Sequence, residues 1–260
     1  MLLAVSVGNT NTVLGVFQGD ELRWQWRMST DPEHTADELA VIFAGFLAQH
    51  ELSFSRQITG VVISSVVPTS TRALREMTER YFGFPPVVLE PGTRTGLPIL
   101  TDNPREVGAD RIANALAAYH RYGGPCIVVD FGTATTYDVV SAKGEFLGGA
   151  IAPGVQVSNE ALSSRTARLP QVELLAPRSV TGRNTVEAIQ SGLLYGSAAE
   201  ADGMVERLQA ELGDHATVVA TGGLAPVVVP LCTRIDEVDE WLTLEGLRLV
   251  FERNVGPADG

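Results

Sequence analysis

Two short turns in this 260-residue sequence carry side chains suited to chemistry on phosphate. The first is Ser6-Val7-Gly8-Asn9-Thr10-Asn11-Thr12-Val13, and the second is Asp130-Phe131-Gly132-Thr133-Ala134-Thr135-Thr136. Glycine lets a backbone approach a ligand closely, and hydroxyl and amide groups donate hydrogen bonds to phosphate oxygens. An aspartate beside Gly-Thr also suits a hard cation, which takes oxygen ligands. The alternatives are a hairpin turn rich in Asn and Gly, and a carboxylate that caps a turn.

A third cluster, Gly108-Ala109-Asp110-Arg111, follows a Pro/Gly-rich segment and opens a predicted helix. A carboxylate that could act as a base stands next to a guanidinium, which can bind a carboxylate or a phosphate in bidentate fashion. This pair suits substrate binding, although an acid in the first turn of a helix is also favoured by the helix dipole alone. Thr221-Gly222-Gly223 follows another predicted strand and would let a flat ring such as adenine approach the backbone.

The chain has little lysine with which to bind phosphate. Lys143 is the only lysine among 19 lysine and arginine residues, and it lies in Ala142-Lys143-Gly144-Glu145. A Walker A loop and the strand lysine of protein kinases are therefore excluded. Any phosphate site must be built from backbone amides, arginine, metal ions and carboxylates.

Composition narrows the class of protein further. A net charge of −12 argues against a nucleic-acid partner and against docking on anionic lipid. No apolar stretch approaches the roughly 20 residues of a membrane helix, and two cysteines cannot form a disulfide framework. The four histidines lack metal-ligand spacing and are expected on the surface or in helices. We expect a reduced, cytoplasmic protein without a membrane partner.

The two turns belong to an internal repeat. Residues 3–14 resemble residues 127–138, so that Ser6 matches Asp130 at an offset of 124, and the same offset joins Glu21-Leu22 to Glu145-Phe146 without a gap. Each copy predicts three strands joined by two turns. Two similar subdomains facing each other across a cleft would bring the turns together to clamp a triphosphate. The alternative is that any two β-hairpins look alike.

Helical and strand patterns alternate along the chain, which predicts an α/β fold. Thr35-Ala36-Asp37-Glu38 is a capping box that opens a helix. Residues 90–106 predict a long ordered loop, and such loops are often functional. The remaining predictions are helices over 69–82, 109–122, 184–212 and 243–253, and strands over 60–67, 86–89 and 217–220.

Taken together, these motifs resemble those of the type III pantothenate kinases, in the actin-like (acetate and sugar kinase) superfamily. The resemblance covers essentially the whole chain. It rests on residues 7–12, Gln25-Trp26-Arg27, 102–111, 130–136, 148–154, Asn184-Thr185 and 244–248. It implies duplicated ribonuclease H-like (actin-like) subdomains, each a mixed sheet flanked by helices, facing across a cleft and dividing at 1–115 and 116–260.

The resemblance implies ATP-dependent phosphorylation of pantothenate to 4'-phosphopantothenate, the first step of coenzyme A biosynthesis, by a cytoplasmic homodimer with Mg²⁺ and a monovalent cation. Residues 6–13 and Thr133 would bind ATP. Residues 108–111 and Thr185 would bind pantothenate, with Asp110 as the base that takes the proton of its primary hydroxyl. Asp130 would hold potassium or ammonium.

The sequence departs from the family pattern at Ser6, where relatives normally have an aspartate that helps to organise Mg²⁺ and the phosphates. Serine is neutral and shorter, so it gives a metal weaker support. Thr101 is a milder departure, because many relatives have tyrosine there. We expect an intact fold with partly retained ligand binding and with impaired or conditional catalysis.

Three hypotheses therefore stay open. The first is an active pantothenate kinase that tolerates Ser6. The second is a catalytically weak or inactive homologue that acts as a pantothenate-binding, nucleotide-binding or regulatory protein. The third is a kinase for another small hydroxylated acid, which the retained residues 108–111 disfavour.

Overall fold

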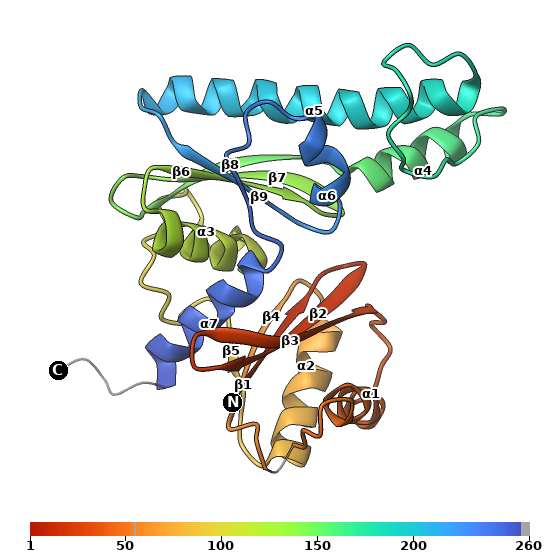
Figure 1. Ribbon diagram of the computed structural model, residues 1–260. Helices are drawn as coiled ribbons and strands as arrows, with labels where there is room; N and C mark the ends of the chain where they lie inside the picture. Colours follow the sequence, from red (N-terminus) through yellow and green to blue (C-terminus); the bar gives the residue numbers. More distant parts are fainter. Residues whose placement is uncertain (55, 256–260) are drawn as a thin grey trace. The chain divides into compact units, whose positions relative to one another are not determined.

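The computed structural model describes residues 1–54 and 56–255, which form two five-stranded sheets flanked by helices (Figure 1). The chain divides into two units. The first comprises residues 1–97, 103–117 and the segment from Leu242 onward, and the second comprises residues 98–102 and 118–241.

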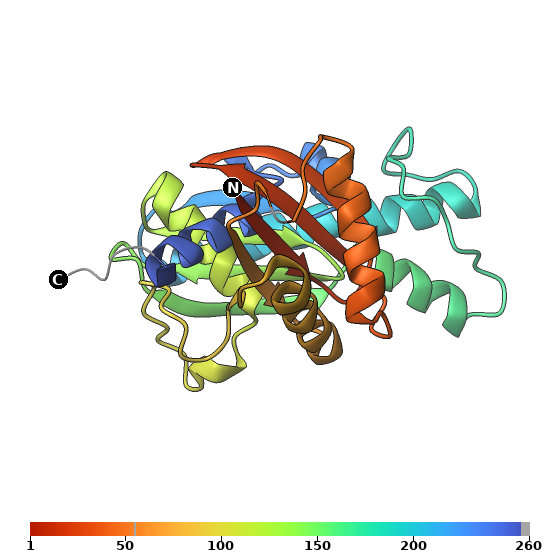
Figure 2. The ribbon, with the colours of Figure 1, turned by 90° about the horizontal axis from the view of Figure 1, so that it is seen from below.

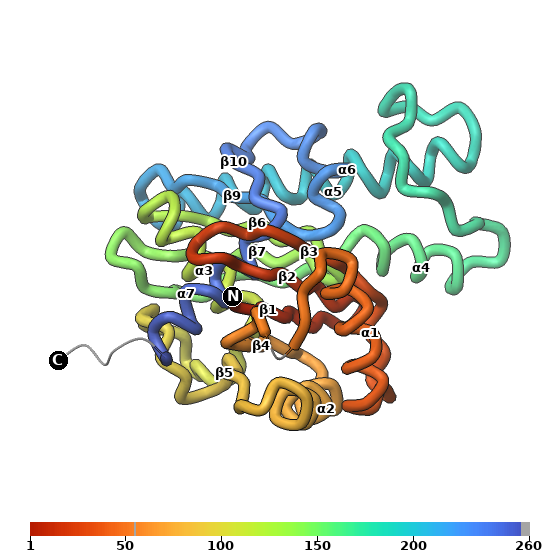
Figure 3. The backbone as a smooth tube through the Cα atoms, turned by 60° about the horizontal axis from the view of Figure 1, so that its bottom comes forward, coloured from red at the N-terminus to blue at the C-terminus, as the bar shows by residue number. Residues whose placement is uncertain are grey.

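The sheet of the first unit has the strand order β3-β2-β1-β4-β5, which Figure 3 shows from edge to edge. Strands β1, β2 and β3 are antiparallel, while β4 and β5 run parallel to β1. The central strand β1 is almost wholly buried, whereas β3 alternates between exposed and half-buried residues, as an edge strand with one covered face should. The bounds are β1 Leu2–Val7, β2 Asn11–Gln18, β3 Glu21–Ser29, β4 Gly60–Ser65 and β5 Val87–Val88.

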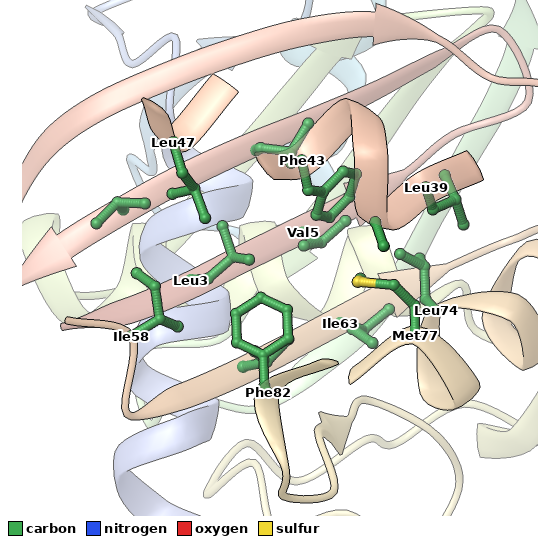
Figure 4. Packing of buried hydrophobic residues seen from close by; sticks show 14 of the residues in the cluster. Leu3, Val5, Leu39, Phe43, Leu47, Ile58, Ile63, Leu74, Met77 and Phe82 are labelled. Atoms are coloured by element: carbon green, nitrogen blue, oxygen red, sulfur yellow. The ribbon is translucent and has the colours of Figure 1, made fainter. Parts of the chain in front are cut away.

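Helices α1 (Ala36–Ala48) and α2 (Pro68–Met77) cover one face of this sheet. The predicted capping box is confirmed, since Thr35 and Glu38 exchange side-chain and backbone hydrogen bonds at the start of α1. The apolar faces of the two helices meet side chains of β1 and β4, and Figure 4 shows Phe43 among them. The helix predicted over 69–82 continues beyond α2 as a π-helix, Thr78–Phe82.

The second unit repeats this plan with the strand order β8-β7-β6-β9-β10. Here α5 lies along the sheet, and Figure 2 shows α4 and the segment that follows it beside the beginning of α5. The strands are β6 Cys126–Phe131, β7 Ala134–Val140, β8 Phe146–Pro153, β9 Thr217–Thr221 and β10 Glu237–Val238. The helices are α4 Val155–Arg165, α5 Thr185–Leu212, α6 Ala225–Val228 and the 3₁₀ turn Val229–Leu231.

Strand order and direction are identical in the two units, so the predicted duplication is confirmed. Even an irregularity is repeated. A bulge leaves Arg23 unpaired between β2 and β3, and the matching bulge leaves Leu147 unpaired between β7 and β8. That the two units face each other across a cleft stays a prediction.

The gapless register inferred from sequence is wrong in the second strand of each copy. In the first turn the Gly8 N–H donates to Asn11 O, whereas in the second the Gly132 N–H donates to Ala134 O, so the first turn is one residue longer. Thr12 therefore matches Thr135 in the sheet register. The turn between β7 and β8 is longer in compensation, which is why the sequences realign afterwards and the shift stays hidden.

The C-terminal helix α7 (Leu242–Val255) belongs to the first unit, whereas the division at 1–115 and 116–260 placed it in the second. It contacts β1, β2 and β4. Thr243 Oγ1 donates to Asn114 Oδ1 at 2.7 Å, and Asn254 Nδ2 donates to Arg94 O at 2.9 Å. Helix α7 joins the first unit because its apolar face is buried against the first sheet. This contact joins distant parts of the chain, so the local sequence of α7 does not predict it.

Candidate functional site

The first turn lies at the carboxyl end of β1. Its tip, Asn9 to Asn11, is exposed, and the Thr30 N–H donates to Thr10 O at 2.9 Å. Behind the tip Thr12 is buried, and its Oγ1 lies 2.9 Å from Thr30 Oγ1. The exposed tip is therefore fixed on its buried side by the two hydrogen bonds that Thr30 makes with Thr10 and Thr12.

Ser6 lies on β1 at the position where the resemblance predicts an aspartate. It is half-buried, and its Oγ accepts a hydrogen bond from Ser64 Oγ at 3.2 Å. Ser64 is its partner in the parallel pairing of β1 with β4, and it is 1% exposed. Two neutral hydroxyls therefore stand where the resemblance predicts a carboxylate. Sequence reasoning missed Ser64, because only the strand register shows that it is a neighbour.

The second turn places Asp130 on β6, between Thr136 on β7 and Thr221 on β9. Gly222 has φ +95°, and a Cβ there would lie 2.3 Å from Asp130 Oδ1. The Asp130 carboxylate therefore packs against the bare backbone of Gly222, in a space that a side chain at position 222 would fill. Exposed Thr133 forms the tip of the turn, and its carbonyl accepts the Gly154 N–H at 3.1 Å.

The Gly108–Arg111 cluster opens helix α3 (Ala109–Tyr122), whose bounds match the prediction. Asp110 is half-buried, and its Oδ1 accepts the Arg111 backbone N–H at 2.9 Å. A Cβ on residue 108 would lie 2.6 Å from the same oxygen, so a larger residue there would displace the Asp110 carboxylate. The carboxylate therefore lies at the N-terminus of α3.

Thr185 is the first residue of α5 and is exposed. The N-cap residue Asn184 accepts the Glu187 N–H at 2.9 Å. Hydrogen bonds from the Arg183 backbone and then from the Arg178 side chain hold the pKa of Glu187 below its usual value. Beside Thr185 lies an open hollow of about 580 Å³ with a largely apolar floor. Its lining includes Leu162, Leu169, Arg183, Ile189 and Leu193.

The predicted site residues thus fall into two groups. The first unit holds residues 6–13 and 108–111, and the second holds Asp130, Thr133 and Thr185. Thr101 lies in the second unit, with its buried Oγ1 unpaired among the residues that the structure describes.

Within the described ranges no cluster of three or more His, Cys, Asp or Glu side chains could hold a metal ion. In the same ranges no helix is long and apolar enough to span a membrane.

Comparison with known proteins shows the family to which this chain belongs. The family model of type III pantothenate kinases matches residues 2–207. The chain belongs to the type III pantothenate kinases. A type III pantothenate kinase of Frankia alni is 59% identical over 256 residues, which cover 98% of this chain and 100% of that protein. Another, from Streptomyces coelicolor, is 56% identical over 262 residues, covering 98% and 99%.

A solved structure supports the fold of this family member. Component A of the (R)-2-hydroxyglutaryl-CoA dehydratase of Acidaminococcus fermentans superposes with a TM-score of 0.56, covering 96% of this chain and 95% of that one. At 13% sequence identity this likeness concerns the fold alone. It agrees with the duplicated actin-like arrangement of two mixed sheets, which is confirmed.

Proposed function

We propose that this chain phosphorylates pantothenate with ATP to give 4'-phosphopantothenate, the first step of coenzyme A biosynthesis. The observation that carries this proposal is the 59% identity to a type III pantothenate kinase over 98% of this chain and 100% of that protein. The proposed site is built without lysine, so the protein acts by positioning, by metal and by one carboxylate, as phosphoryl transfer allows.

Asp110 is the proposed general base. One carboxylate oxygen accepts the Arg111 N–H, and in this proposal the other oxygen takes the proton of the substrate hydroxyl. The Arg111 side chain provides the positive charge for the pantothenate carboxylate or for a phosphate oxygen. Gly108 and Ala109 complete this part of the pantothenate site, because small residues keep the approach to Asp110 open.

The first turn, residues 6–13, is the proposed ATP phosphate site. Its exposed tip offers backbone N–H groups together with the side chains of Asn9, Thr10 and Asn11. Mg²⁺ supplies charge neutralisation to the phosphates when it is bound with ATP. Ser6 can offer that ion a hydroxyl oxygen, which is a weaker ligand than a carboxylate. These residues can therefore hold Mg²⁺ only when it is bound together with the nucleotide. We expect a low rate of phosphoryl transfer.

Asp130 is the proposed ligand of a monovalent cation, potassium or ammonium. Its Oδ1 lies against the bare backbone of Gly222, and a carboxylate oxygen is a suitable ligand for a hard cation. Thr133, at the exposed tip of the same turn, is the proposed second contact to ATP. A cation there would offset the charge of the phosphates, a role that lysine fills in other kinases.

Thr185 is proposed as a pantothenate contact in a cytoplasmic homodimer. Two apolar side chains close to it in the sequence are exposed: Val180 is 64% exposed and Val186 is 45% exposed. A second copy that covers this region would bury them. The net charge of −12 speaks against nucleic-acid and membrane partners. Light scattering on purified protein tests the dimer, and a monomer at micromolar concentration would contradict it.

The activity is tested by incubating the purified protein with ATP, Mg²⁺, potassium and pantothenate, and measuring 4'-phosphopantothenate by mass spectrometry. Product is expected from the unmodified chain. Asp110→Asn should lower kcat by about 10²- to 10⁴-fold, the usual contribution of a general base, while ATP binding is retained. Thermal stabilisation by ATP and pantothenate without any product would instead favour a binding or regulatory protein.

A further inference from the structure

A small cavity with a mostly apolar wall lies directly behind the first turn. It gives the centre of a water molecule about 10 Å³ of space, enough for one water. Apolar side chains of β1, β3, α1 and α2 form most of its wall, but five polar residues also line it. They are Thr12, Thr30, Asp31, His34 and Ser70.

Two of these residues carry buried polar atoms without a hydrogen-bond partner within the described ranges. Ser70, in the first turn of α2, is only 7% exposed, and its Oγ is unpaired. The Nδ1 of His34 is also buried and unpaired, while the other ring nitrogen lies 4.0 Å from Asp31 Oδ2. His34 was expected on the surface or in a helix, yet its side chain is only 24% exposed and precedes α1. Buried polar atoms of this kind are normally satisfied by protein or ordered water.

Thr12 and Thr30 connect the cavity to the turn. Thr12 Oγ1 and Thr30 Oγ1 lie 2.9 Å apart, and one proton between them leaves hydrogen-bonding capacity for a third group. Thr30 also donates its backbone N–H to Thr10 O, at the exposed tip. A group that fixes Thr30 from the cavity side therefore restrains the tip of the turn.

We propose that His34 and Ser70 are positioning residues that hold one buried water against the Thr12–Thr30 pair, and that this water fixes the first turn for ATP. This inference rests on the proposed role of residues 6–13 in binding the phosphates. The water receives or donates one hydrogen bond at Nδ1, one at the serine hydroxyl and one at the threonine pair. That number matches the partners a buried water usually makes. Water-mediated bonds of this kind restrain a site nearly as well as direct ones.

The test compares four variants that separate the hydrogen bond from the shape of the side chain. His34→Asn keeps a polar atom near the position of Nδ1, whereas His34→Gln moves it towards the position of the other ring nitrogen. Ser70→Thr keeps the hydroxyl, and Ser70→Ala removes it. Each variant is assayed for KM of ATP, KM of pantothenate and kcat, and its ATP Kd is measured without pantothenate.

His34→Gln and Ser70→Ala should raise the KM and Kd of ATP by about two- to tenfold, which corresponds to one lost hydrogen bond. His34→Asn and Ser70→Thr should stay within about twofold of the unmodified chain. The KM of pantothenate and kcat should change little in all four. Equal ATP constants in all variants, or equal loss in the matched pairs, would overturn the proposal.

Two further measurements keep the inference separate from the proposed function and from simple unfolding. If the unmodified chain binds no ATP, the proposed function has failed, whatever the variants do. If the unmodified chain binds ATP but the variants bind it equally well, the inference alone has failed. A crystal structure of the unmodified chain should show an ordered water within hydrogen-bond distance of Ser70 Oγ and His34 Nδ1. A dry cavity would overturn the proposal even if a variant fails to fold.

Discussion

The two copies of the strand–turn–strand unit share their sheet but differ in their turns. Both have the same strand order, the same directions and the same bulge, at Arg23 in one and Leu147 in the other. The first turn is one residue longer and follows a strand with Ser6 as its next-to-last residue, whereas the second follows a strand with Asp130 at that position. Packing therefore preserves the scaffold in both units, while the difference in chemistry is concentrated in a few turn residues.

The strands next to these turns differ in a matching way. Ser6 lies beside Ser64, which donates a hydrogen bond to it. Asp130 lies beside Thr221, and the residue that follows Thr221 is Gly222, in a left-handed conformation. The first copy has Ser65 at the corresponding position. The carboxylate of the second copy thus requires a glycine beside it, and the hydroxyl of the first copy does not.

The largest effect on this comparison is expected from Gly222→Ala. The new Cβ would lie 2.3 Å from Asp130 Oδ1 and 2.7 Å from the Phe131 backbone, at a φ of +95°. We expect a loss of about 3 kcal/mol in the free energy of unfolding, from overpacking together with left-handed strain. Urea unfolding measures this, with Ser65→Ala in the first copy as the control, expected near 1 kcal/mol. Equal losses would contradict the difference between the copies.

A smaller effect is expected when the charge of the second turn is removed. Asp130→Asn keeps the shape of the side chain but should lower kcat/KM by about 10²-fold and abolish stimulation by potassium, because a preorganised charge in the site is lost. The measurement is the initial rate across a potassium titration. Ser6→Ala is the matched change in the first copy, and it should leave the potassium dependence intact. Potassium stimulation that survives Asp130→Asn would place the cation elsewhere.

The N-caps of α1 and α5 allow a comparison in which we expect changes of about 1 kcal/mol in the free energy of unfolding. Thr35 caps α1 and Asn184 caps α5, and each accepts the N–H of a glutamate three residues later. Thr35→Ala and Asn184→Ala should each cost about 1 kcal/mol of stability. Thermal unfolding checks both. A loss for Thr35→Ala alone would show that α5 is held by tertiary packing.

The smallest effect concerns pH. Hydrogen bonds from Thr35 lower the pKa of Glu38, and those from Arg183 and Arg178 lower the pKa of Glu187. A lowered folded-state pKa stabilises the protein above the unfolded value, 4.5, and this stabilisation is lost as the pH falls through the folded value. Glu38→Gln and Glu187→Gln should therefore unfold with a shallower dependence on acid pH. Unchanged acid profiles would contradict both assignments.

Local patterns predicted the elements that local chemistry controls. The bounds of α3, Ala109–Tyr122, and the start of α5 at Thr185 follow from helical periodicity and an N-cap, so the sequence was sufficient for them. Strand β1 and its copy β6 followed from their apolar runs and the repeat.

Features that depend on contacts between distant residues could not be predicted. The register of β1 with β4 decides that Ser64 meets Ser6, and packing decides that α7 joins the first unit. The extra residue of the first turn was hidden because a later turn compensates for it. The cavity wall formed by His34 and Ser70 likewise requires α1, α2 and the sheet to be in place.

The role of the missing carboxylate is tested most directly by comparing Ser6→Asp with the unmodified chain, with Ser6→Asn as the neutral control. If the absent carboxylate limits catalysis, Ser6→Asp should raise kcat/KM with Mg²⁺-ATP by about tenfold, equivalent to roughly 1.4 kcal/mol, and Ser6→Asn should not. Equal rates for Ser6→Asp and the unmodified chain, with both folded, would contradict the central claim that the two turns differ in chemistry because of this residue.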